Sequence, residues 1–148
     1  MMFVVVFGPP CSGKSSLVKR LHEKFGGEVV SSDEFKGRRY GRLFERCARL
    51  ASEDFVFVNG TFFKRGLRED MREIGGEQLW VFLWCGLDVA LERNRLRKDR
   101  IGERGLKIMF SEFEMPGLDE YDVKLDSGAL SMDEMFKIVD GLIRNRES

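Results

Sequence analysis

The chain has 148 residues, which is enough for one domain around a single core but too few for separate catalytic and accessory domains. Its 25 basic and 25 acidic residues balance, so net charge would not drive it onto a membrane or an extended nucleic acid duplex. Three scattered cysteines argue against a disulfide framework, and no apolar stretch has the length of a membrane span. We therefore expect one soluble domain over residues 1–148, in a reducing cytoplasm.

The apolar run at residues 2–7 predicts a buried strand, and the sequence GPPCSGKS follows it at once. The two glycines, the lysine and the serine have the spacing of a phosphate-binding loop, and they lie between a strand and a helical pattern, as such a loop requires. Backbone N–H groups of the loop and the first turn of the next helix bind phosphate together. We assign nucleotide binding to Gly8, Pro9, Pro10, Cys11, Ser12, Gly13, Lys14, Ser15 and Ser16. The alternative is a Gly/Pro turn that carries Lys-Ser by chance.

Two residues of this loop have chemical roles of their own. The Lys14 ammonium is expected to reach the outer two phosphates of ATP, and the Ser15 hydroxyl to be a ligand of Mg²⁺. Cys11 is interpreted as a small filler of the loop.

Helical spacing over residues 17–25, ended by two glycines, predicts the first helix. A second strand at residues 29–30 ends at Ser-Ser-Asp-Glu, which places Asp33 at the same edge of the sheet as the loop. A carboxylate there can accept the proton of an acceptor hydroxyl during phosphoryl transfer; the alternative is a cap on the next helix. Lys36, one turn on, is expected to bind an anionic acceptor, with a solvated surface lysine as the alternative.

The remaining elements alternate to the end of the chain. We expect helices at residues 36–50, 64–74, 89–98 and 132–143, a helical piece ending near 114, and strands at 55–58, 79–84 and 122–125. This alternation predicts an α/β fold of three layers, in which a parallel sheet carries helices on both faces. Ligands of such folds bind beyond the carboxyl ends of the strands.

The third strand is followed by Asn59-Gly60-Thr61. Nucleotide hydrolases commonly place an aspartate at this point for the magnesium shell, whereas Asn59 adds no charge. We assign Thr61 and Arg68 to acceptor binding, with bracing of the helix as the alternative for Arg68.

An arginine-rich segment follows the fourth strand. Arg93 and Arg97 are four residues apart and face one side of a helix, and Arg100 and Arg104 flank a loop that carries Gly102 and Gly105. A mobile lid around residues 93–105 would bring these arginines onto the charge that develops during phosphoryl transfer. The alternative is a surface helix with internal salt bridges.

The chain resembles the small P-loop kinases related to polynucleotide kinase, adenylylsulfate kinase, seryl-tRNA(Sec) kinase and the zeta toxins. The resemblance rests on GPPCSGKS, SSDEFK, VNGTFFKRGLRED, ALERNRLRKDR and FEMPGLDEYDVKLDS, and it covers nearly the whole chain. It implies an adenylate-kinase-like fold with strand order 2-3-1-4-5, phosphate and magnesium binding by Lys14 and Ser15, contact of Asp33 with the acceptor hydroxyl, and contact of Arg93 and Arg97 with phosphates. Relatives of polynucleotide kinase usually carry an aspartate within residues 59–61, which this chain lacks.

These observations predict an ATP- and Mg²⁺-dependent kinase that phosphorylates a hydroxyl of a small-molecule or RNA acceptor, with Lys14, Asp33, Arg93 and Arg97 as its catalytic residues. Adenylylsulfate is an alternative acceptor. A P-loop NTPase or nucleotide-binding switch without an acceptor is the alternative function. Such a switch needs a residue that orients the attacking water and a segment that senses the γ-phosphate, and the sequence offers no clear candidate for either.

Overall fold

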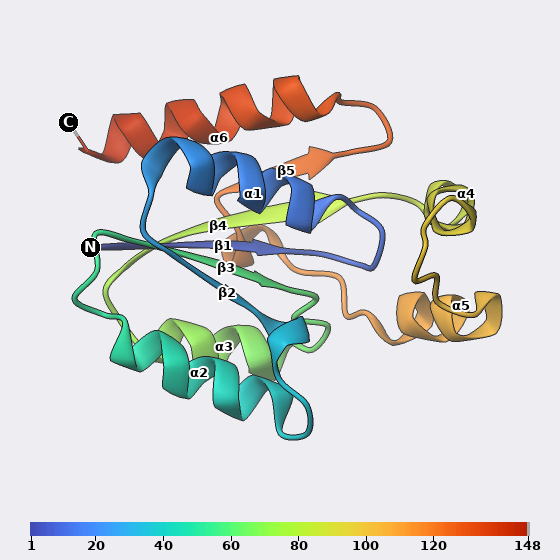
Figure 1. Cartoon of the computed structure of the whole chain (residues 1–148), viewed down its shortest axis with the longest axis horizontal. Helices are drawn as coiled ribbons and strands as arrows, with labels where there is room; N and C mark the ends of the chain where they lie inside the picture. Colours follow the sequence, from blue (N-terminus) through green and yellow to red (C-terminus); the bar gives the residue numbers. More distant parts are fainter. Residues whose placement is uncertain (148) are drawn as a thin grey trace.

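The computed structural model describes residues 1–147. Within them, strands and helices alternate along the chain (Figure 1). The elements are β1 Met2–Phe7, α1 Lys14–Phe25, β2 Glu28–Ser31, η1 Ser32–Glu34, α2 Arg39–Arg49, β3 Phe55–Gly60, α3 Arg65–Glu73, β4 Glu77–Trp84, α4 Leu87–Arg95, α5 Glu103–Glu112, η2 Leu118–Glu120, β5 Val123–Asp126 and α6 Met132–Glu147. The η elements are single turns of 3₁₀ helix.

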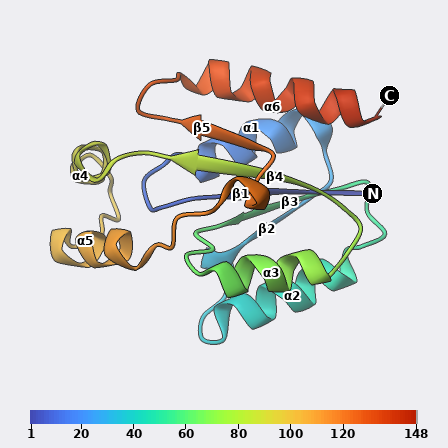
Figure 2. The ribbon, with the colours of Figure 1, turned by 180° about the vertical axis from the view of Figure 1, so that it is seen from behind.

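The five strands form one parallel sheet in the order β2-β3-β1-β4-β5, which confirms the predicted fold class and strand order. Helices α1 and α6 cover one face of the sheet, and α2 and α3 cover the other (Figures 1 and 2). Helices α4 and α5 lie beyond the carboxyl ends of the strands, next to the loop that follows β1. No helix among the described residues is long and apolar enough to cross a membrane.

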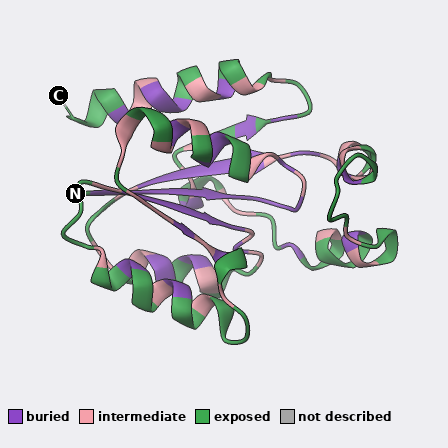
Figure 3. Cartoon of the chain, in the orientation of Figure 1, coloured by how far each residue is buried: buried purple, intermediate pink, exposed green. Residues whose placement is uncertain are grey.

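The central strand β1 is buried along its whole length because helices cover both of its faces (Figure 3). Its alternate side chains enter two different cores. Val4 and Val6 pack with residues of α1 and α6, whereas Phe3, Val5 and Phe7 pack under α2 and α3. An apolar run without alternation is therefore typical of a strand that is buried on both faces, as β1 is in the middle of the sheet.

Helix α2 begins later than the sequence predicted. Gly37 and Arg38 both have left-handed backbone conformations, with φ values of 58° and 44°, and an α-helix cannot pass through such residues. The helix therefore starts at Arg39 instead of residue 36. Asp33 belongs to the separate turn η1, so the alternative role of Asp33 as a cap of α2 is wrong.

Helix α4 also ends earlier than predicted, at Arg95 instead of residue 98. The segment after it is closed by the Asn94 side chain, whose Nδ2 donates to Ile101 O (2.6 Å) and whose Oδ1 accepts from Ile101 N–H (2.9 Å). Ile101 packs in turn on a small core that includes Leu106 of α5. The segment at residues 93–105 is thus the end of α4, this closed loop and the start of α5.

Candidate active site

The loop between β1 and α1 is folded tightly against the neighbouring strand. A Cβ at Gly8 would lie 1.9 Å from the carbonyl oxygen of Leu83 in β4, so only glycine fits there. Gly13, directly before α1, has a φ of 101°, which favours a residue without a side chain. These two glycines allow the chain to turn from β1 into α1 over the carboxyl edge of the sheet.

Lys14 lies partly buried in this loop, and its Nζ donates to Pro9 O over 2.8 Å. Burial lowers the pKa of the Lys14 ammonium from 10.5 to about 8, and the carboxylate of Asp33 is the strongest influence in the opposite direction. Asp33 is therefore close enough to Lys14 for their charges to interact. Lys14 and Asp33 follow the parallel strands β1 and β2, so both lie at the carboxyl edge of the sheet.

Ser15 is exposed in the first turn of α1, and its Oγ accepts a hydrogen bond from Asn59 Nδ2 over 3.0 Å. Parallel pairing places Asn59 beside Val6, at the carboxyl end of β3. Magnesium binds oxygen ligands and is often held by one or two protein groups together with substrate phosphates. The Ser15 hydroxyl fits that requirement, with the side-chain amide of Asn59 beside it. Among residues 1–147 there is no cluster of three or more His, Cys, Asp or Glu side chains suited to a metal.

The two arginines of α4 and its extension approach the loop differently. Arg93 donates from Nη1 to Cys11 O (3.0 Å) and to Ser127 Oγ (2.9 Å), and from Nη2 to Ser127 O (2.6 Å). Arg97 is exposed, and its Nη1 contacts Cys11 Sγ at 3.5 Å. Arg93 therefore fastens the phosphate-binding loop to the end of β5, whereas Arg97 keeps most of its donors open to a ligand. Ser127 was not predicted, although its place after the last strand puts it at the ligand-binding edge.

The predicted acceptor side lies around η1. Asp33 and Lys36 are both exposed, and neither forms a hydrogen bond or an ion pair within the described part of the chain. Thr61 is partly exposed after β3. The carboxylate of Asp33 is thus free to meet a ligand.

Arg68 is the predicted acceptor residue that the structure places elsewhere. Its side chain is completely buried, where it forms an ion pair with Glu120 at 2.9 Å and donates from Nε to Phe62 O (2.9 Å) and from Nη2 to Glu114 O. The guanidinium also lies over the Phe113 ring. These contacts correspond to the bracing alternative, because they leave no exposed atom of Arg68 for an acceptor.

The turn that carries Thr61 is held from two sides. Phe62 has a left-handed backbone with a φ of 47°. Its N–H donates to Tyr40 Oη over 2.8 Å, and its carbonyl accepts from Arg68. Tyr40 and Arg68 therefore fix the path of the chain directly after Thr61. Nothing in the sequence indicated this hydrogen bond of Tyr40.

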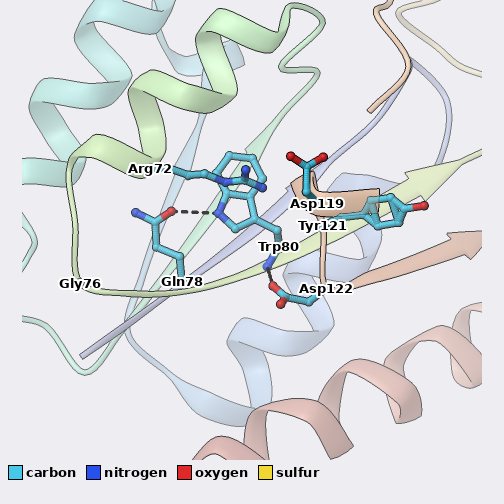
Figure 4. Close-up of a pocket in the computed structure, with 7 residues that line it drawn as sticks. All are labelled: Arg72, Gly76, Gln78, Trp80, Asp119, Tyr121 and Asp122. Atoms are coloured by element: carbon cyan, nitrogen blue, oxygen red, sulfur yellow. Dashed lines mark hydrogen bonds between the residues drawn. The ribbon is translucent and has the colours of Figure 1, made fainter. Parts of the chain in front are cut away.

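A cavity of about 410 Å³ lies at the opposite, amino end of β4 (Figure 4). Most of its polar groups are already engaged. Trp80 Nε1 donates to Gln78 Oε1, Trp80 N donates to Asp122 Oδ2, and the Arg72 guanidinium lies 4.8 Å from the Trp80 ring. This cavity is not part of the phosphate-binding site, since parallel α/β sheets bind ligands at their carboxyl edge.

Solved structures with a similar fold include several kinases. The chain is similar to a gluconokinase from Sinorhizobium meliloti 1021, with 25% identity, a TM-score of 0.78 and coverage of 97% of this chain and 93% of the other. It also matches a shikimate kinase from Bacteroides thetaiotaomicron (14% identity, TM-score 0.71, 97% and 98% covered) and a tunicamycin resistance protein from Deinococcus radiodurans (17% identity, TM-score 0.69, 95% and 94% covered). The last two likenesses concern the fold alone.

Comparison with curated protein sequences gave no match. The model of the AAA_33 family, described as an AAA domain, matches residues 3–116, which include the phosphate-binding loop, η1, β3 and α4. The chain therefore belongs to the AAA_33 family, and its fold is that of the small P-loop kinases.

Proposed function

We propose that the protein transfers the γ-phosphoryl group of Mg-ATP to a hydroxyl of a small-molecule acceptor. The observation that carries this proposal is the free carboxylate of Asp33. It has no partner in residues 1–147, and it lies near enough to oppose the lowering of the Lys14 pKa. An NTPase has no need of a second carboxylate-lined subsite, whereas a kinase must hold an acceptor hydroxyl there.

Each residue has a distinct part in the proposed reaction. The hydroxyl oxygen of the acceptor bonds to the γ-phosphorus while Asp33 accepts the proton of that hydroxyl. The bond between the γ-phosphorus and the β–γ bridging oxygen breaks, and ADP is released. Lys14 and Arg97 hold the transferred phosphoryl group and the leaving phosphates. Mg²⁺, when bound through Ser15, neutralises phosphate charge. Arg93 positions the loop through Cys11 O.

A small-molecule acceptor is supported by the similarity to the gluconokinase and by the balanced charge of the chain. RNA ends and adenylylsulfate remain the alternative acceptors to test. The three cysteines are free thiols, which fits a reducing compartment such as the cytoplasm.

The test is a transfer assay with γ-labelled ATP and a panel of polyols, sugar acids, sugar phosphates, adenylylsulfate and 5′-hydroxyl RNA. We expect label on one class of acceptor. Asp33→Asn should lower kcat by roughly 10²-fold or more while leaving ATP affinity unchanged, because a general base commonly contributes 10²–10⁴. ATP hydrolysis at a rate that no acceptor alters, and that Asp33→Asn does not reduce, would contradict the proposal and favour the NTPase.

A further inference from the structure

Two cysteines, Cys11 and Cys85, come together at the carboxyl edge of the sheet. Strands β1 and β4 are parallel neighbours in which Phe7 pairs with Phe82, so the segments that follow them lie side by side (Figure 1). Cys11 lies in the loop after β1, and Cys85 follows β4 directly. The Cys85 Sγ donates to Cys11 O over 3.7 Å, and Cys11 packs against the small core that contains Cys85. The two cysteines are therefore in contact, although 74 residues separate them in the chain.

The two thiols differ in their access to solvent. Cys11 is partly exposed, whereas Cys85 is completely buried together with Ala90 and Leu106. Burial is the main cause that raises the pKa of the Cys85 thiol to about 11; Arg93 acts in the opposite direction, and Cys11 adds to the increase. A reagent from solvent therefore reaches the sulfur of Cys11 first, and the neutral thiol of Cys85 lies behind it.

Cys11 also lies among cationic groups. The Arg97 Nη1 is 3.5 Å from Cys11 Sγ. After burial and Asp33, the thiols of Cys85 and Cys11 are the next strongest influences on the pKa of Lys14, so both are close to its ammonium. Positive charge stabilises the thiolate, which is the form of cysteine that reacts with oxidants, and reactive cysteines are commonly partly exposed in such surroundings. These features go beyond the role of a small filler of the loop.

We propose that Cys11 is a site of oxidation by hydrogen peroxide and that Cys85 then forms a reversible disulfide with it. In the first step the Cys11 sulfur bonds to one peroxide oxygen and the O–O bond breaks, which gives a sulfenic acid on Cys11 and a molecule of water. In the second step the Cys85 sulfur bonds to the Cys11 sulfur, the S–O bond breaks, and hydroxide leaves with the Cys85 proton as a second water. The two thiols are oxidised, and the peroxide is reduced. A dithiol such as dithiothreitol reverses the change by thiol–disulfide exchange.

The disulfide would act on the phosphate-binding loop. It joins Cys11 to the segment just before α4 and takes the Cys11 sulfur away from Arg97, which it now contacts. A disulfide also imposes its own narrow geometry on the two residues that it joins. Because ATP phosphates bind to the N–H groups of this loop, the oxidised protein should bind ATP more weakly. The inference concerns nucleotide binding and holds for any acceptor.

Mass spectrometry of the full chain tests the disulfide. The reduced protein is treated with a small excess of hydrogen peroxide, free thiols are blocked with N-ethylmaleimide, and tryptic peptides are compared with and without dithiothreitol. The wild type should yield peptide 1–14, which contains Cys11, joined to peptide 73–93, which contains Cys85. A folded protein that keeps all its thiols, or that joins Cys47 to either of the others as readily, would overturn the inference.

Single variants separate the two steps. Cys85→Ala should leave Cys11 as a sulfenic acid that dimedone traps, and Cys11→Ser should leave Cys85 unmodified because Cys85 is buried. Cys47→Ala is the matched control. Cys47 is also completely buried, and burial raises its pKa to about 12, so this variant should form the same disulfide as the wild type. Dimedone labelling of Cys11 that is no greater in Cys85→Ala than in the wild type would contradict the assignment of Cys85 as the partner.

Nucleotide affinity shows whether the disulfide acts on the loop. AMP-PNP is titrated into the oxidised wild type by calorimetry, before and after treatment with dithiothreitol. The Kd of the disulfide form should be about tenfold higher or more, which corresponds to the loss of one charge-assisted hydrogen bond to phosphate, and reduction should restore the original value. Oxidised Cys47→Ala should show the same loss. Equal affinities of the disulfide form and the reduced wild type would show that the bond leaves the phosphate site open, contrary to the inference.

Discussion

Asn59 Nδ2 donates a hydrogen bond to Ser15 Oγ over 3.0 Å, which joins the end of β3 to the first turn of α1. The contact places a neutral amide beside the proposed magnesium ligand. Related P-loop proteins commonly have a carboxylate after this strand, so magnesium bound here would depend more heavily on the nucleotide phosphates.

Asn59→Asp should therefore lower the Mg²⁺ concentration that gives half-maximal transfer, on the order of tenfold, because it adds a negative charge beside an oxygen ligand. Asn59→Ala serves as the comparison, since it removes the amide and adds no charge. The measurement is the Mg²⁺ dependence of initial rates at saturating ATP. An unchanged Mg²⁺ requirement in Asn59→Asp would show that position 59 does not contribute to the metal shell.

The lowered pKa of Lys14 predicts that ATP binding takes up a proton near pH 8. In the free protein the Lys14 pKa is about 8, so about half of the molecules are neutral at that pH, and bound phosphates raise the pKa again. Calorimetry at pH 8 in two buffers of different ionisation enthalpy should give an uptake of about half a proton. Lys19→Met, an exposed change on the same helix, should retain this uptake; zero uptake in the wild type would contradict the prediction.

The same group has a defined effect on stability. Below pH 8 both the folded and the unfolded protein carry the proton, so Lys14 adds no pH dependence to the stability. Between about pH 8 and 10.5 the unfolded chain retains the proton that the folded protein has lost, so the contribution of Lys14 makes the folded state more stable as pH rises. The difference between wild type and Lys14→Met in urea denaturation should follow this trend, and a difference that is constant over the range would contradict it.

The sequence predicted the α/β class and the phosphate-binding loop because both depend on local patterns, whereas the strand order came from the resemblance to the small P-loop kinases. An apolar strand, a Gly-rich turn and an amphipathic helix lie together in the first 25 residues. The buried position of the Arg68 side chain could not be predicted from local patterns. An arginine just after β3 looks the same in sequence whether it points toward a ligand or toward Glu120, which lies 52 residues further along the chain. The start of α2 depends likewise on the backbone conformation of Arg38, for which arginine itself has no preference.

Tyr40→Phe tests the turn after β3. The variant removes the acceptor of the Phe62 N–H, and an unsatisfied buried donor costs about 1–3 kcal/mol. Unfolding free energy should fall by that amount, and KM for the acceptor should rise more than KM for ATP because the turn carries Thr61. Tyr121→Phe is the matched control, since the structure gives the Tyr121 hydroxyl no hydrogen bond to a described residue. Equal stability losses in the two variants would argue against the role of the Tyr40 bond.

Arg68→Met tests the buried ion pair between α3 and η2. Both side chains are almost inaccessible, with exposed fractions of 0% for Arg68 and 3% for Glu120. Removing one partner leaves an uncompensated buried charge, a change that commonly costs about 3–5 kcal/mol. Guanidinium denaturation should report a loss of that size for Arg68→Met.

Arg65 offers the control for this loss, because it lies on the same helix and makes ion pairs in which its side chain is 53% exposed. Exposed pairs contribute about 0–1 kcal/mol, so Arg65→Met should change stability little. The double variant Arg68→Met/Glu120→Gln should recover part of the loss, since it removes the charge that the single variant leaves unpaired. If Arg68→Met cost no more than Arg65→Met, the bracing role of Arg68 would be wrong, and its assignment to the acceptor would have to be considered again.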